Sequence, residues 1–141
     1  MHLHCITKYE LVKKILITPL FVLFVFAANA EWDMLFCTNA DSLSTCKPSG
    51  EQFARTSNET PLQVMVMSKD ALGVDKLLYM IFLMKNEKEG NLYADLTLTI
   101  DPNALFAVKR IKFYRPGTYK IDVLDAATNK PLTTGKVTIT E

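Results

Sequence analysis

The chain has 141 residues, with 16 Lys and Arg against 15 Asp and Glu, which gives a formal net charge of +1 at pH 7. A near-neutral chain without a long basic cluster disfavours nucleic acid or an anionic membrane as the main partner. Both histidines, His2 and His4, precede the predicted mature chain, which excludes Ser-His-Asp and Cys-His nucleophiles from it. We therefore expect a protein that is not an enzyme and needs no cofactor.

Residues 1–30 are predicted to be a secretory signal peptide that is removed. Lys13 and Lys14 precede an apolar run over residues 15–26, and the segment ends in the small-residue sequence Ala-Asn-Ala. An uncleaved anchor is the alternative, but the run is shorter than the roughly 20 apolar residues of a spanning helix. We expect one mature domain, residues 31–141, that is periplasmic or secreted and has no stable membrane span.

Two cysteines remain in the predicted mature chain, Cys37 and Cys46. Export places them in a compartment that favours oxidation, so we expect a disulfide between them, with a pair of free thiols as the alternative. The stretch Thr38–Glu59 holds the second cysteine and shows no periodicity. A pattern-free segment of this length is typical of a functional loop.

Seven β-strands are predicted from apolar alternation and from short apolar runs. They cover residues 32–37, 60–67, 77–84, 92–100, 106–113, 119–125 and 132–140. The clearest alternation lies in residues 92–100, where Leu92 and Leu96 face one way and Tyr93 the other. Short strands at this spacing, without helical periodicity, predict an all-β, antiparallel two-sheet sandwich.

The sequence from Pro116 to Val123 resembles the sixth strand of immunoglobulin-like domains, as found in exported bacterial β-sandwiches. Those domains often carry Gly-x-Tyr-x-Cys-x-Val; here Gly117 and Tyr119 match, and Ile121 stands at the cysteine position. The resemblance implies an Ig-like sandwich in which the tyrosine hydroxyl turns back to the backbone. Because both cysteines precede the second predicted strand, a disulfide across the core is not expected.

Surplus apolar strand surface is the main indication of function. If Val64 and Val66 face the core, the neighbouring methionines face out, and residues 77–84 have no polar side at all. A two-layer sandwich covers one face of each sheet, so one apolar row needs a further cover. The candidate protein-binding face consists of Met65, Met67, Tyr79, Ile81 and Leu83. The alternative cover is the Thr38–Glu59 loop.

Three further patterns resemble chemical sites. Met65 and Met67 would project from one face, and paired thioethers can bind Cu(I), although methionine is also ordinary core filler. Ser44 and Lys47 have the Ser-x-x-Lys spacing of penicillin-binding acyltransferases but lack the companion motifs. The basic residues in and just after the predicted strand over residues 106–113 indicate a solvated surface. They are Lys109, Arg110, Lys112 and Arg115.

Together these observations predict a non-catalytic protein-binding or accessory module of the cell envelope, or of a secretion or surface assembly. Its partner is expected to be an envelope protein or a second copy of the chain, and addition of a strand at an open edge is one way in which it could join. A periplasmic small-ligand or copper carrier using Met65 and Met67 is one alternative. A secreted effector or inhibitor acting through the Thr38–Glu59 loop is the other.

Overall fold

The computed structural model describes residues 32–39, 41 and 43–141, so the predicted signal peptide lies outside the described residues. The described part forms nine strands and one 3-10 turn, η1 (Leu43–Thr45). The strands are β1 (Trp32–Cys37), β2 (Cys46–Pro48), β3 (Gln52–Ala54), β4 (Thr60–Ser68), β5 (Lys76–Leu83), β6 (Leu92–Thr99), β7 (Phe106–Phe113), β8 (Gly117–Asp125) and β9 (Pro131–Thr140). Over the same residues, no helix has the length and apolarity needed to span a membrane.

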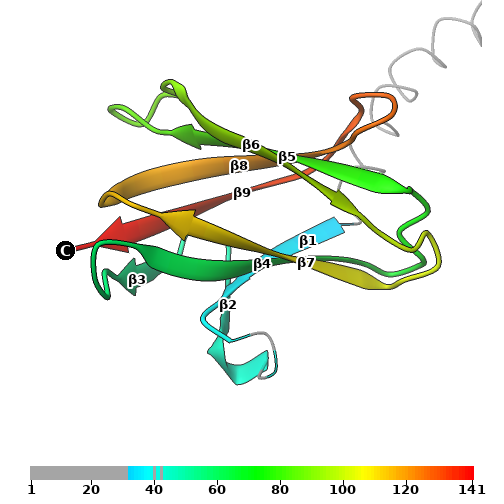
Figure 1. Ribbon diagram of the computed structural model, residues 1–141, viewed down its shortest axis with the longest axis horizontal. Helices are drawn as coiled ribbons and strands as arrows, with labels where there is room; N and C mark the ends of the chain where they lie inside the picture. The colour runs from blue at the N-terminus through cyan, green and yellow to red at the C-terminus, as the bar shows by residue number, and fades with distance from the viewer. Residues whose placement is uncertain (1–31, 40, 42) are drawn as a thin grey trace, which may run out of the picture. The chain divides into compact units, whose positions relative to one another are not determined.

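The strands pack as two sheets face to face, and η1 projects from the β2 edge of the smaller sheet (Figure 1). The four-stranded sheet has the order β2-β1-β4-β7, and the five-stranded sheet has the order β3-β9-β8-β5-β6. This arrangement is that of an Ig-like fold, with β1, β4 and β7 in the places of strands A, B and E and β5, β8 and β9 in those of C, F and G. The predicted all-β, two-sheet Ig-like sandwich is confirmed.

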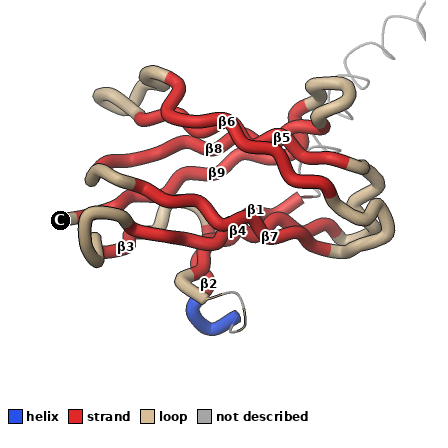
Figure 2. Tube along the Cα trace, viewed as in Figure 1, coloured by secondary structure: helices blue, strands red, loops and turns tan. Residues whose placement is uncertain are grey.

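All strand pairs are antiparallel except one, which the sequence did not predict. The three-residue strand β3 pairs with β9 in parallel, so Phe53 lies beside Ile139. Figure 2 shows that strands make up most of the described domain and that loops join them. Both β2 and β3 fall inside the stretch predicted to be irregular, because three-residue strands are too short to show alternation.

The core lies between the two sheets and is built from their inward rows. Its fully buried large side chains include Phe36 of β1, Leu62 of β4, Leu77 of β5 and Ile121 of β8. Each of these rows alternates with more exposed positions, as a two-sheet sandwich requires. Burial of this apolar surface is the main stabilising contribution to the fold.

Tyr119 anchors one end of the core. Its ring contacts Phe113 at 4.6 Å and Tyr93 at 5.1 Å between centroids, and its hydroxyl donates a 2.7 Å hydrogen bond to the carbonyl of Arg115. Burial raises the pKa of this phenol, and the neighbouring tyrosine raises it further. The return of the tyrosine hydroxyl to the backbone, which the Ig-like resemblance implied, is confirmed.

The outward orientation expected for the odd-numbered row of β5 is wrong. Tyr79 and Ile81 are 0% exposed and lie in the core, and Leu83 packs against it. The register explains the direction, because Tyr79 pairs with Val123 and Ile81 with Ile121, both on the inward row of β8. Cross-strand partners share a face, so the apolar run of β5 takes its direction from its neighbour.

A β-bulge in β6 breaks the predicted alternation at Leu92 and Tyr93, while Ala94, Leu96 and Leu98 pack on the core as expected. Ile81 pairs with Ala94 but Phe82 pairs with Leu92, so Tyr93 is the extra residue. A bulge shifts which side chains face the core. Leu92 therefore lies exposed, and Tyr93 packs on the core beside Phe113.

The predicted disulfide is confirmed. Cys37 of β1 and Cys46 of β2 are cross-strand partners, 4.0 Å apart between Cα atoms, and their sulfurs are bonded. The bond pins η1 and β2 to the first strand. A structural disulfide of this kind indicates an extracytoplasmic protein.

Candidate functional site

The two sheets have edge strands that lie on the same side of the sandwich. β6 is the last strand of the five-stranded sheet, and β7 is the last strand of the four-stranded sheet. Both are eight residues long. An edge strand of this length presents unpaired backbone groups that can accept another strand.

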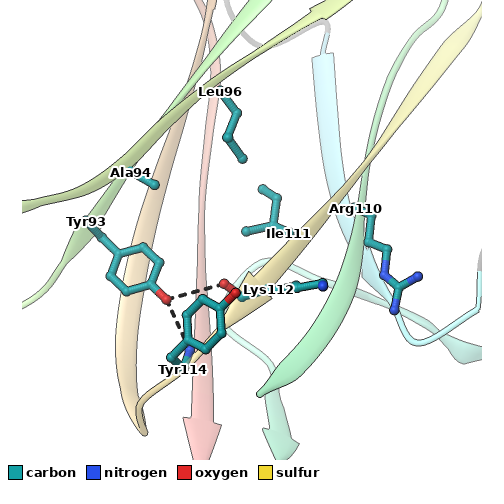
Figure 3. A pocket seen from close by; sticks show the side chains of 7 residues that line it. All are labelled: Tyr93, Ala94, Leu96, Arg110, Ile111, Lys112 and Tyr114. Atoms are coloured by element: carbon teal, nitrogen blue, oxygen red, sulfur yellow. Dashed lines mark hydrogen bonds between the residues drawn. The ribbon is translucent and has the colours of Figure 1, made fainter. Parts of the chain in front are cut away.

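A groove of about 550 Å³ separates β6 from β7 (Figure 3). Leu96 of β6 and Ile111 of β7 point toward each other across it, and Tyr93 lies at one end beside Tyr114. The side chain of Arg110 extends away from Tyr93, on the other side of β7. The groove therefore has an apolar floor and a basic outer flank.

The hydroxyl of Tyr93 occupies one end of the free edge of β7. It donates to the carbonyl of Lys112 at 3.3 Å and accepts from the backbone N–H of Tyr114 at 3.1 Å. The backbone groups of Lys112 thus point away from β4. Because backbone groups alternate in direction along a strand, those of Val108 and Arg110 also point to the open edge.

An apolar patch covers the outer face of the four-stranded sheet, at the start of β7. We call it the outer apolar patch, and it consists of Leu43, Met65, Met67, Leu105 and Phe106, which line a common hollow of about 340 Å³. Leu43, Leu105 and Phe106 are 67%, 58% and 56% exposed. Three of the five exposed large apolar side chains among the described residues thus gather at one place.

The methionines of β4 point outward as expected, but they differ in access. Met65 is only 4% exposed, because Leu35 and Val108 flank it on the neighbouring strands and Leu43 approaches from η1. Met67 is half-buried. One residue of the Thr38–Glu59 segment, Leu43, therefore covers part of the methionine surface, as the alternative from sequence expected.

The structure separates the candidate face into two groups. Met65 and Met67 lie together in the outer apolar patch, whereas Tyr79, Ile81 and Leu83 belong to the core of the sandwich. Leu105, Phe106 and Tyr114 were not predicted as site residues; they are exposed apolar side chains at the two ends of the edge strand β7. Phe106 shares its strand with Lys109, Arg110 and Lys112, and that excess of charge on one strand was the signal available in the sequence.

The basic residues predicted as one strip lie at three different places. Arg110 and Lys112 stand on the outer row of β7, where Lys112 pairs with Glu59 at 3.7 Å. Lys109 belongs to the core-facing row and is half-buried. Arg115 lies beyond β7, next to a smaller hollow lined by Leu83 and Tyr93. A charged residue on the inward row of an edge strand is one way in which sheets discourage unwanted pairing.

The remaining polar motifs have ordinary structural surroundings. Ser44 lies in η1 and Lys47 in β2, where the Lys47 ammonium lies 5.5 Å from the centroid of the Phe53 ring. Asp122 accepts a 2.7 Å hydrogen bond from the hydroxyl of Thr134. Over the described residues, no group of three or more His, Cys, Asp or Glu is arranged to hold a metal ion.

No known family model matches this chain, and no curated protein matches it either. Two solved structures of the CARDB domain of a Pyrococcus furiosus protein are similar to it. The crystal structure, determined in complex with di-metal ions, has 16% sequence identity and a TM-score of 0.41, and the alignment covers 77% of this chain and 92% of that one. The solution NMR structure has 13% identity and a TM-score of 0.39, covering 78% and 94%. The strand order of this chain itself is that of an Ig-like fold.

Proposed function

We propose that the protein is a non-catalytic protein-binding module of the cell envelope or of a surface assembly, located in the periplasm or outside the cell. The observation that carries this proposal is the outer apolar patch, where Leu43, Leu105 and Phe106 stay exposed side by side. Scattered apolar residues are normal on a protein surface, but clustered ones mark interaction sites. The Cys37–Cys46 disulfide supports the extracytoplasmic location.

The residues of the outer apolar patch come from well-anchored parts of the sandwich. Met67 comes from β4, an interior strand, and pairs directly with Phe106 of β7. Leu43 comes from η1, between the two halves of the disulfide. A surface positioned in this way needs little ordering when a partner binds, which favours affinity.

Co-purification tests the proposal. The full chain carries a C-terminal tag and is expressed in its host, and its partners are compared with those of a Leu105→Lys/Phe106→Lys variant. Leu92→Lys is the matched control, since it also removes an exposed large apolar side chain but lies on β6. Substitutions at such exposed positions change stability little.

We expect the first variant to lose the specific partner and the control to retain it. Equal recovery by all three proteins would remove the outer apolar patch as the binding surface. Sedimentation of the purified protein is expected to give a monomer. A dimer that dissociates in the Leu105→Lys/Phe106→Lys variant would instead identify the partner as a second copy.

One observation favours a second function, copper carriage. Met65 and Met67 line the same hollow, so two thioethers share one surface, and thioethers are suitable ligands for Cu(I). Titration with Cu(I) tests this alternative, with a Met65→Leu/Met67→Leu variant as the control. Absence of binding by the unaltered protein would end it.

A further inference from the structure

We propose that the free edge of β7 binds an extended peptide segment with alternating apolar and acidic residues, which adds to the four-stranded sheet as a further strand. This inference rests on the proposed function and deepens it, because it names the chemical form of the partner. The added strand would lie along β7 between Val108 and Lys112, beside the groove that faces β6.

The backbone of β7 supplies the first part of the argument. The N–H and C=O groups of Val108 and Arg110 point to the open edge, because those of Lys112 and Tyr114 meet the Tyr93 hydroxyl on that side. On the other side, the carbonyl of Leu105 accepts from Ser68 at 3.2 Å, next to β4. Backbone groups at a free edge give affinity to strand addition.

The hydroxyl of Tyr93 bonds to this edge in the way an added strand would. It accepts from the N–H of Tyr114 and donates to the C=O of Lys112, as a residue of a neighbouring parallel strand would do. The bulge at Tyr93 turns this side chain toward β7. One end of the edge is therefore occupied, and an added strand would fill the remaining length.

Side chains of an added strand would alternate between two different surroundings. One row would enter the groove and contact Leu96 and Ile111, which form its apolar floor. The other row would stand beside Arg110 and Lys112 on the outer face, where opposite charges across a strand pair are stabilising. Lys112 has Glu59 at 3.7 Å, and both side chains remain well exposed, so a second carboxylate can approach.

The sequence pattern of the bound peptide follows from the surroundings of its two side-chain rows. Apolar residues at every second position match the groove, and acidic residues between them match the basic flank. A segment with lysine in place of the acidic residues would meet Arg110 and Lys112 with like charge, which is destabilising for directly opposed residues.

Titration with a synthetic peptide tests the inference. The probe is a capped peptide of about eight residues, the usual length of a strand, in which valine and aspartate alternate. Two control peptides accompany it: the valine–lysine analogue, and a valine–aspartate peptide that is N-methylated on the amides that would face β7. Binding is followed by the backbone amide resonances of the isotope-labelled protein.

We expect the amides of Val108 and Arg110 to shift and to gain protection from exchange, while those of Lys109 and Ile111, which face β4, change little. Both control peptides should bind about tenfold more weakly or worse, since one lacks the charge match and the other the backbone donors. An Arg110→Glu/Lys112→Glu variant should prefer the lysine peptide.

Absence of binding, equal binding of the N-methylated peptide, or equal binding of the lysine analogue would each overturn the inference. The Leu105→Lys/Phe106→Lys variant separates it from the proposed function. That variant should lose the natural partner and keep the peptide. If no peptide binds while the outer apolar patch still captures its partner, the proposed function stands and the strand-addition mode is wrong.

Discussion

The hydroxyl of Tyr93 accepts a 3.1 Å hydrogen bond from the backbone N–H of Tyr114, which joins the edge strands of the two sheets. The same hydroxyl donates to the carbonyl of Lys112. A side chain from β6 thus satisfies two backbone groups at the end of β7 that would otherwise face solvent. It closes one end of the groove and leaves the rest of the β7 edge open.

Removal of this hydroxyl should loosen the end of the edge without unfolding the domain. In Tyr93→Phe, the ring contacts with Phe113 and Tyr119 remain, while the two backbone hydrogen bonds are lost. We expect the free energy of unfolding to fall by about 1 kcal/mol. The amide of Tyr114 should exchange faster with solvent. Unchanged exchange at Tyr114 would show that the bond is absent in solution.

Two buried tyrosines should respond in opposite ways to replacement by phenylalanine. Tyr119 donates to the carbonyl of Arg115, so Tyr119→Phe should destabilise the domain by about 1 kcal/mol. The Tyr79 hydroxyl has no hydrogen-bond partner among the described residues, so Tyr79→Phe should be neutral or stabilising by about the same amount. Urea denaturation of the two variants measures the difference. Equal destabilisation would indicate a partner for Tyr79 in solution.

Tyr79 should also make the domain sensitive to alkali. Burial raises the pKa of this phenol well above its ordinary value of 10.0, because the charged form is poorly solvated in the core. The folded state then holds the proton more tightly than the unfolded state. Tyr79 therefore does not lower the free energy of unfolding below pH 10, and it lowers that free energy progressively as the pH rises above 10. Denaturation from pH 8 to 11 should show this decline, and Tyr79→Phe should reduce it.

The disulfide should contribute strongly to stability. A Cys37→Ser/Cys46→Ser variant loses a cross-link that closes a short loop, at a cost of up to about 3 kcal/mol. Thermal denaturation with and without a reducing agent measures this. Reduction should lower the melting temperature of the unaltered protein and leave that of the variant unchanged. An equal response of both proteins would contradict a Cys37–Cys46 bond.

Lys109 should restrain self-pairing of the free edge. It stands on the core-facing row of β7, and Lys109→Val removes the only charge from that row. We expect the variant to associate as its concentration rises, as judged by light scattering. Lys136→Val is the control, because β9 is paired on both sides, with β3 and β8. Association of both variants alike would point to general loss of solubility.

Alternation predicted the strands well where one face is polar. In β8, Ile121 and Val123 alternate with Lys120 and Asp122, and the structure buries the apolar row as expected. In β5 every position from Leu77 on is apolar, so alternation could not say which row faces inward. That choice depends on register with β8, a long-range property that a local pattern does not contain.

The candidate site was predictable only in part, for similar reasons. The outward direction of Met65 and Met67 followed from β4 alone, and the structure agrees. The exposure of Phe106 depends on β7 being an edge strand, which strand order decides. The inward turn of Tyr93 depends on a one-residue bulge, and a bulge changes the pairing without leaving a mark in the apolar pattern.

The central claim is that this domain binds a protein partner through the outer apolar patch, and photo-crosslinking in intact cells tests it most directly. A benzophenone amino acid placed at position 106 should give a discrete adduct with one protein of higher mass. The same amino acid at position 92, where the native side chain on β6 is also well exposed, should give none. Adducts of the same pattern and yield at both positions, or none at position 106, would contradict the account.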